Sequence, residues 1–155
     1  MNKHRLCFAY LVAAFPIAAC VAQPYAAPVE GPTASISLST NVDQAIVLVV
    51  HADAQHCAGH SIFSPTPDSR KTTIRAGAPI ALTVGLRMNM PACPVTVRFT
   101  PLESKRYALY YKNTGAACTL LLGLIDDDGV INVQPAETLK ASGSYGPTAN
   151  WCASP

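Results

Sequence analysis

Three histidines and one cysteine lie close together in the chain, and these are residue types that ligate transition metals: His51, His56, Cys57 and His60. Imidazole nitrogen and thiolate sulfur both bind zinc or copper, so periplasmic copper or zinc binding is one hypothesis. The surrounding residues are rich in Ala, Gly, Ser and Pro, which is typical of an irregular loop. Residues in an irregular loop, unlike those in a helix or strand, are not brought to a common face by their spacing in the sequence. We therefore expect a solvated loop without a cofactor and keep metal binding as an alternative.

Four cysteines outside the N-terminal segment predict a disulfide framework: Cys57, Cys93, Cys118 and Cys152. An even number of cysteines in an oxidising compartment indicates two disulfides, and four cysteines allow three pairings. We prefer Cys93–Cys118 within a sheet and Cys57–Cys152 holding down the C-terminal tail. The second bridge would also remove Cys57 as a metal ligand and as a thiol nucleophile.

The remaining polar motifs do not predict catalysis. The acids at 126–128, followed by Gly129, lack the further acids and the closing Glu of an EF-hand loop. They are typical of a tight β-turn. No serine lies in a Gly-x-Ser-x-Gly motif, and no glycine-rich phosphate loop occurs. We therefore expect a protein that is not an enzyme, with no catalytic residues.

The N-terminal segment has the layout of an export signal. Residues 1–5 carry two positive charges, and residues 6–19 are uncharged and mostly apolar. That stretch is shorter than the ~20 residues of a membrane-spanning helix. Lys3 and Arg5 account for the formal net charge of +2, so the rest of the chain is formally neutral. A neutral domain without a basic patch argues against a nucleic-acid partner.

The end of this segment, Ile17-Ala18-Ala19-Cys20, resembles a lipobox. The resemblance implies that residues 1–19 are a cleaved signal peptide. It also implies diacylglycerol on the sulfur of Cys20 and an acyl chain such as palmitate on the new N-terminus, which together anchor a protein firmly. Val21 in place of an Asp implies, by the rule for enteric bacteria, the outer membrane facing the periplasm. The alternative is cleavage after Ala22 or Ala26, which would give a soluble periplasmic or secreted protein.

The chain after the signal divides into a tether and one domain. Residues 20–34 contain three prolines and little that could pack, which predicts a tether. Residues 35–155 contain about seven or eight short β-prone segments separated by turn residues, without a sustained helical period. This pattern predicts an all-β fold, an antiparallel immunoglobulin-like sandwich stapled by disulfides. We expect 52–70 to be an irregular connection with a short strand at 61–63, and 135–140 to form one helical turn.

Three tyrosines lie on one predicted strand, at 106–112. Tyr107 and Tyr111 share one face, and Tyr110 takes the other. We expect the first two in the core. The alternative is that the strand presents an exposed aromatic face that binds a partner or a carbohydrate.

Two further resemblances concern the domain itself. Cys93, the run at 99–101 (Phe-Thr-Pro), Tyr107 and Cys118, in that order, resemble the core of small proteobacterial envelope lipoproteins built on a β-sandwich. That resemblance implies a fold and no activity. The run at 141–146 (Ala-Ser-Gly-Ser-Tyr-Gly) resembles the Ser-Gly-x-x-Tyr inhibitory loop of membrane-bound lysozyme inhibitors, with the tyrosine one residue early. It implies, as an alternative, an inhibitor or immunity protein against an envelope-attacking hydrolase.

The expected function is therefore that of a membrane-tethered lipoprotein of the cell envelope. It would act as a non-enzymatic binding or structural module whose partner is another envelope protein or a glycan.

Overall fold

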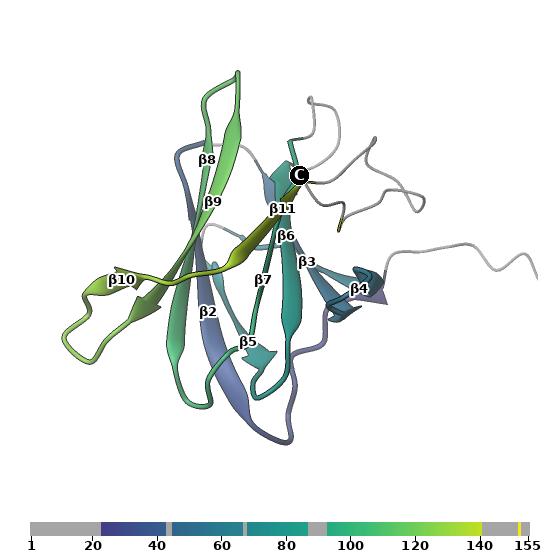
Figure 1. Cartoon of the computed structure of the whole chain (residues 1–155), viewed down its shortest axis with the longest axis vertical. Helices are drawn as coiled ribbons and strands as arrows, with labels where there is room; N and C mark the ends of the chain where they lie inside the picture. The colour runs from purple at the N-terminus through teal and green to yellow at the C-terminus, as the bar shows by residue number, and fades with distance from the viewer. Residues whose placement is uncertain (1–22, 43–44, 67, 87–92, 141–151, 153–155) are drawn as a thin grey trace, which may run out of the picture.

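The computed structural model describes residues 23–42, 45–66, 68–86, 93–140 and 152, and these residues form two β-sheets that face each other (Figure 1). Sheet A has the strand order β1 (Gln23–Pro24), β4 (Ala58–Phe63), β3 (Ile46–Asp53), β6 (Ile80–Leu86), β7 (Val95–Phe99) and β11 (Glu137–Lys140). Sheet B has the order β10 (Ile131–Val133), β9 (Cys118–Ile125), β8 (Arg106–Asn113), β2 (Thr33–Thr40) and β5 (Lys71–Arg75). The described residues include no helix long and apolar enough to span a membrane. The all-β prediction is confirmed.

The prediction of a purely antiparallel arrangement is wrong, because both sheets are mixed. β1 pairs with β4 in parallel, and β2 pairs with β8 in parallel, whereas the other strand pairs are antiparallel. Parallel neighbours need a long crossover connection. Between β2 and β8 the chain forms β3, β4, β6 and β7 of sheet A as well as β5 of sheet B. This long connection allows β8 to lie beside β2 and to run in the same direction.

Two segments differ from the sequence prediction. The expected helical turn at 135–140 is wrong, because Glu137–Lys140 forms β11 and pairs with β7 along an edge that would otherwise be open. The expected irregular connection is also shorter than predicted. β4 begins at Ala58, because a tight turn at 54–57, with Cys57 at a φ of 49°, joins it to β3; Gly59 within β4 also has a positive φ, of 62°.

Part of the predicted tether belongs to the folded unit. Gln23 and Pro24 form β1, whose register partners are Ser61 and Ile62 of β4. An edge strand is one of the few positions in a sheet that tolerates proline, since proline has no N–H to donate. Ala34 lies in β2 and is buried. The prolines of this segment therefore mark an edge strand and turns as well as a connection.

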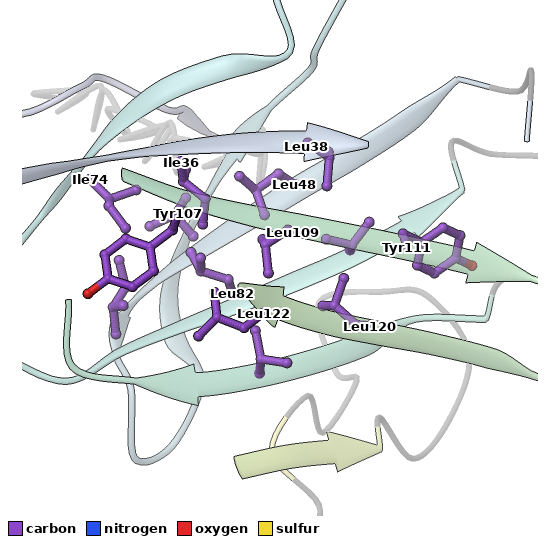
Figure 2. Packing of buried hydrophobic residues seen from close by; sticks show 14 of the residues in the cluster. Ile36, Leu38, Leu48, Ile74, Leu82, Tyr107, Leu109, Tyr111, Leu120 and Leu122 are labelled. Atoms are coloured by element: carbon purple, nitrogen blue, oxygen red, sulfur yellow. The ribbon is translucent and has the colours of Figure 1, made fainter. Parts of the chain in front are cut away.

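The hydrophobic core fills the space between the two sheets (Figure 2). The alternating residues Ile36 and Leu38 of β2 point into it, as the period of two predicts. Leu48, Leu82 and Leu109 are all at most 1% exposed. Each such side chain stabilises the fold by roughly 1.5–3 kcal/mol through its removal from water.

Candidate functional site

The hairpin of β3 and β4 carries the three histidines of the sequence cluster, and it separates them. His51 of β3 and His60 of β4 are cross-strand partners, with ring centroids 6.5 Å apart. His56 lies in the turn between the strands, beside Cys57, which is in a disulfide. No group of three or more His, Cys, Asp or Glu side chains positioned to hold a metal occurs among the described residues.

His51 is part of a buried polar row on the outer face of sheet A. Its Nε2 lies 2.8 Å from the hydroxyl oxygen of Thr83 on β6, which lies 2.7 Å from the hydroxyl oxygen of Thr96 on β7. All three residues are at most 1% exposed. Burial lowers the pKa of His51 to about 4, a hydrogen bond with the Cys57 backbone opposes this, and the nearby His60 adds to it. At neutral pH His51 is therefore a neutral hydrogen-bonding group within the sheet.

His56 has a structural partner in the turn. Its Nδ1 lies 2.8 Å from a carboxylate oxygen of Asp53. The other carboxylate oxygen accepts hydrogen bonds from the backbone N–H groups of Gln55 and His56, at 2.9 and 3.1 Å. These hydrogen bonds, first of all the one from the His56 side chain, lower the pKa of Asp53. The Asp53 carboxylate is thus the group that orders the β3–β4 turn.

The disulfides join Cys57 to Cys152 and Cys93 to Cys118, which is the pairing preferred from the sequence. Cys57 packs with Ala54 and Ala81 in a second small cluster, on the face of sheet A that points away from the core, and Cys152 lies against it. The first bridge therefore ties the C-terminal part of the chain to the β3–β4 turn. The second joins the start of β9 to the segment just before β7.

The acidic segment at 126–129 forms the turn between β9 and β10. A carboxylate oxygen of Asp126 accepts a hydrogen bond of 2.7 Å from the N–H of Val130, and the Arg106 guanidinium donates to the Asp126 backbone carbonyl. Gly129 has a φ of 83°, a conformation that favours glycine. Asp126 therefore has a capping role in a tight turn, in line with the sequence interpretation.

The predicted faces of the tyrosine strand are confirmed. Tyr107 and Tyr111 are buried in the core, where the Tyr111 hydroxyl donates to the Cys93 carbonyl at 3.0 Å. Tyr110 points the other way and joins three exposed aliphatic residues on the outer face of sheet B, which we call the sheet B patch: Tyr110 (38% exposed), Leu121 (50%), Ile131 (57%) and Val133 (70%). A shallow groove of about 170 Å³ runs among these residues. An exposed apolar cluster of this kind is typical of a protein interaction surface.

Gly123 shapes this patch. It lies on β9 opposite Val133 of β10. A Cβ atom at position 123 would overlap the Cγ2 methyl of Ile131. The absence of a side chain at position 123 therefore leaves the space that the Cγ2 methyl of Ile131 occupies.

A larger pocket of about 380 Å³ lies where the segment after β1 meets sheet A and the β5–β6 turn. We call it the β1 pocket. Tyr25 and Pro28 line one side, Ser61 lines the β4 side, and Arg75 and Pro79 line the side of the turn. Burial raises the pKa of Tyr25, and the nearby Arg75 opposes that shift. The phenol and the guanidinium thus line the same pocket.

No protein-family model matches the chain, and no curated protein resembles it at a significant level.

Sequence reasoning missed the Thr83–Thr96 row and the β1 pocket. The two threonines occupy outward positions of predicted strands, and only the register of β3, β6 and β7 brings them to His51. The pocket draws on three segments that are distant in the chain. Three features singled out from the sequence lie outside the described residues: the signal peptide at 1–19, the lipid-bearing Cys20 and the inhibitor-like run at 141–146.

Proposed function

We propose that this chain is exported, carries a lipid on Cys20 and works in the cell envelope as a non-enzymatic binding module on an immunoglobulin-like sandwich. The export signal and the lipobox resemblance support the anchoring, with the outer membrane facing the periplasm as the location. The two disulfides support an oxidising compartment, because such bridges persist outside the cytosol.

The sheet B patch is the observation that carries the binding role. Aliphatic side chains that are half or more exposed cost free energy in water, and a partner that covers them recovers it. Tyr110 adds an aromatic residue, a type enriched at protein interfaces. Because Leu121, Ile131 and Val133 are aliphatic, the patch suits another envelope protein better than a glycan.

Photocrosslinking in intact cells tests this role. A photoreactive residue in place of Ile131 should give one dominant adduct with an envelope protein, and Leu121→Glu should abolish it. Thr119→Glu is the matched control, since it adds the same charge at an exposed position of the same strand, and it should leave the adduct intact. An adduct that survives Leu121→Glu would contradict the proposal. If the captured protein is a hydrolase that the purified chain inhibits, the inhibitor or immunity role becomes the specific form of this function.

The intact mass of the protein from native membranes, beside that of a Cys20→Ala variant, tests the anchor. A chain that begins at Cys20 with added acyl chains, and a variant that leaves the membrane fraction, are the expected results. An unmodified chain that begins after Ala22 would instead establish a soluble exported protein. Cleavage after Ala26 would remove Tyr25, whose hydroxyl donates to the Thr73 carbonyl at 2.7 Å.

A further inference from the structure

The segment that follows the proposed lipid anchor is fixed to both sheets. Gln23 and Pro24 pair with β4 of sheet A, and the Tyr25 N–H donates to the Ile62 carbonyl at 2.9 Å. The Tyr25 hydroxyl donates to the carbonyl of Thr73 on β5 of sheet B at 2.7 Å. The chain therefore joins the sandwich at β1, and hydrogen bonds to both sheets hold Tyr25 in place.

A lipid on Cys20 would hold the β1 pocket near the membrane surface. Only Val21 and Ala22 separate Cys20 from β1. An extended chain covers at most about 3.6 Å per residue, so Tyr25 at the pocket wall lies no more than about 18 Å from the Cα atom of Cys20. The pocket can thus reach the polar headgroups of the bilayer that holds the anchor.

The chemistry of the pocket fits a phosphate group attached to an apolar body. Arg75 is its charged lining residue, and its side chain forms no ion pair or hydrogen bond within the described part of the chain. The planar guanidinium is the side chain that best matches phosphate oxygens, because it donates two parallel hydrogen bonds. Ser61 offers a hydroxyl, while Pro28 and Pro79 provide apolar walls for the carbons next to the phosphate.

We propose that the β1 pocket binds the phosphate-bearing headgroup of a membrane phospholipid beside the anchor, with Arg75 as its main contact. This inference rests on the proposed lipidation of Cys20. A bound headgroup would add a second attachment point and fix the orientation of the sandwich on the membrane, with the β1–β4 edge toward the lipid.

Arginine-specific labelling of the natively processed protein in nanodiscs tests the proposal. One set of discs contains phosphatidylglycerol, and the other contains digalactosyldiacylglycerol, which has no phosphate. Phenylglyoxal modification of Arg75, followed by peptide mass spectrometry, should be about fivefold slower in the phospholipid discs, as expected for one charge-assisted contact. Arg70, which is also exposed but does not line the pocket, should react equally in both.

A second measurement uses matched variants. Hydrogen exchange at the Tyr25 amide should slow on going from glycolipid to phospholipid discs in the native sequence and in Arg70→Gln, and this change should be lost in Arg75→Gln. Free inorganic phosphate that protects Arg75 equally in glycolipid discs would indicate a site for a soluble anion and overturn the lipid assignment. An acylated protein whose Arg75 reacts equally in both discs would overturn this inference alone. A native mass without acyl chains would overturn the proposed anchoring and this inference together.

Discussion

The Nε2 atom of His51 lies 2.8 Å from the hydroxyl oxygen of Thr83, inside a sheet where neither residue is more than 1% exposed. A protonated imidazolium at this position would have lost its hydration, which is why burial lowers the pKa of His51 to about 4. The unfolded chain exposes the same imidazole, with an ordinary pKa near 6.5. This difference couples the stability of the fold to pH.

The first prediction follows from this coupling. Between pH 6.5 and pH 4 the unfolded state binds a proton that the folded state does not, so stability is complete above pH 6.5 and falls on acidification. From pH 7 to pH 5 the free energy of unfolding should fall by about 2 kcal/mol. Urea unfolding across this range measures it. His51→Gln, which does not titrate, should flatten the profile. A native profile that is flat from pH 7 to pH 5 would refute the prediction.

The second prediction concerns the middle of the buried row. Thr83→Val keeps the shape of the side chain but removes the partner of both His51 and Thr96. Since a buried polar group without its partner costs about 1–3 kcal/mol, Thr83→Val should destabilise more than Thr96→Val, which disturbs one contact. Urea unfolding at pH 7 gives both values. Thr119→Val, at an exposed position, should change stability by less than about 0.5 kcal/mol. Equal costs at positions 83 and 96 would show that the row does not act as a chain.

The sequence predicted local properties better than pairing partners. The alternation of Ile36 and Leu38 marks their inward face, because a strand has a period of two whatever lies beside it. The parallel pairing of β2 with β8 and the addition of β11 to β7 depend on contacts between distant segments, which no local pattern encodes. The same limit applies to the sites. Thr83 looks like any outward strand residue until the register of sheet A places His51 beside it, and Arg75 looks like any solvated cation until the fold places it and Tyr25 in the same pocket.

The third prediction compares the two disulfides. Cys57 and Cys152 are 95 residues apart in the chain, and Cys93 and Cys118 are 25 apart. In the chain-entropy model a longer closed loop restricts the unfolded state more, which gives about 4.5 kcal/mol for the first bridge and about 3.5 kcal/mol for the second. Replacing both cysteines of a pair by alanine, and measuring urea unfolding without reductant, should therefore cost more for the Cys57–Cys152 pair. A smaller cost for that pair would mean that the C-terminal tie contributes less than its loop length predicts.

The fourth prediction addresses the contact between Gly123 and Ile131 that shapes the sheet B patch. Gly123→Ala places a methyl group against the Cγ2 methyl of Ile131, so β10 must move away from β9 at a cost of about 1–2 kcal/mol. Gln134 directly follows β10, and its N–H donates to the Leu122 carbonyl at 2.9 Å. This N–H should then exchange faster with solvent.

The double variant Gly123→Ala/Ile131→Ala separates this steric cause from others. Ile131→Ala alone should change stability little, because its side chain is more than half exposed. Added to Gly123→Ala, it should restore most of the lost stability, so that the two substitutions are coupled by about 1 kcal/mol. If the stability losses of the two substitutions simply add, the alanine at position 123 destabilises β9 without a clash against Ile131. In that case the position of β10, and with it the shape of the patch, would not depend on the missing side chain.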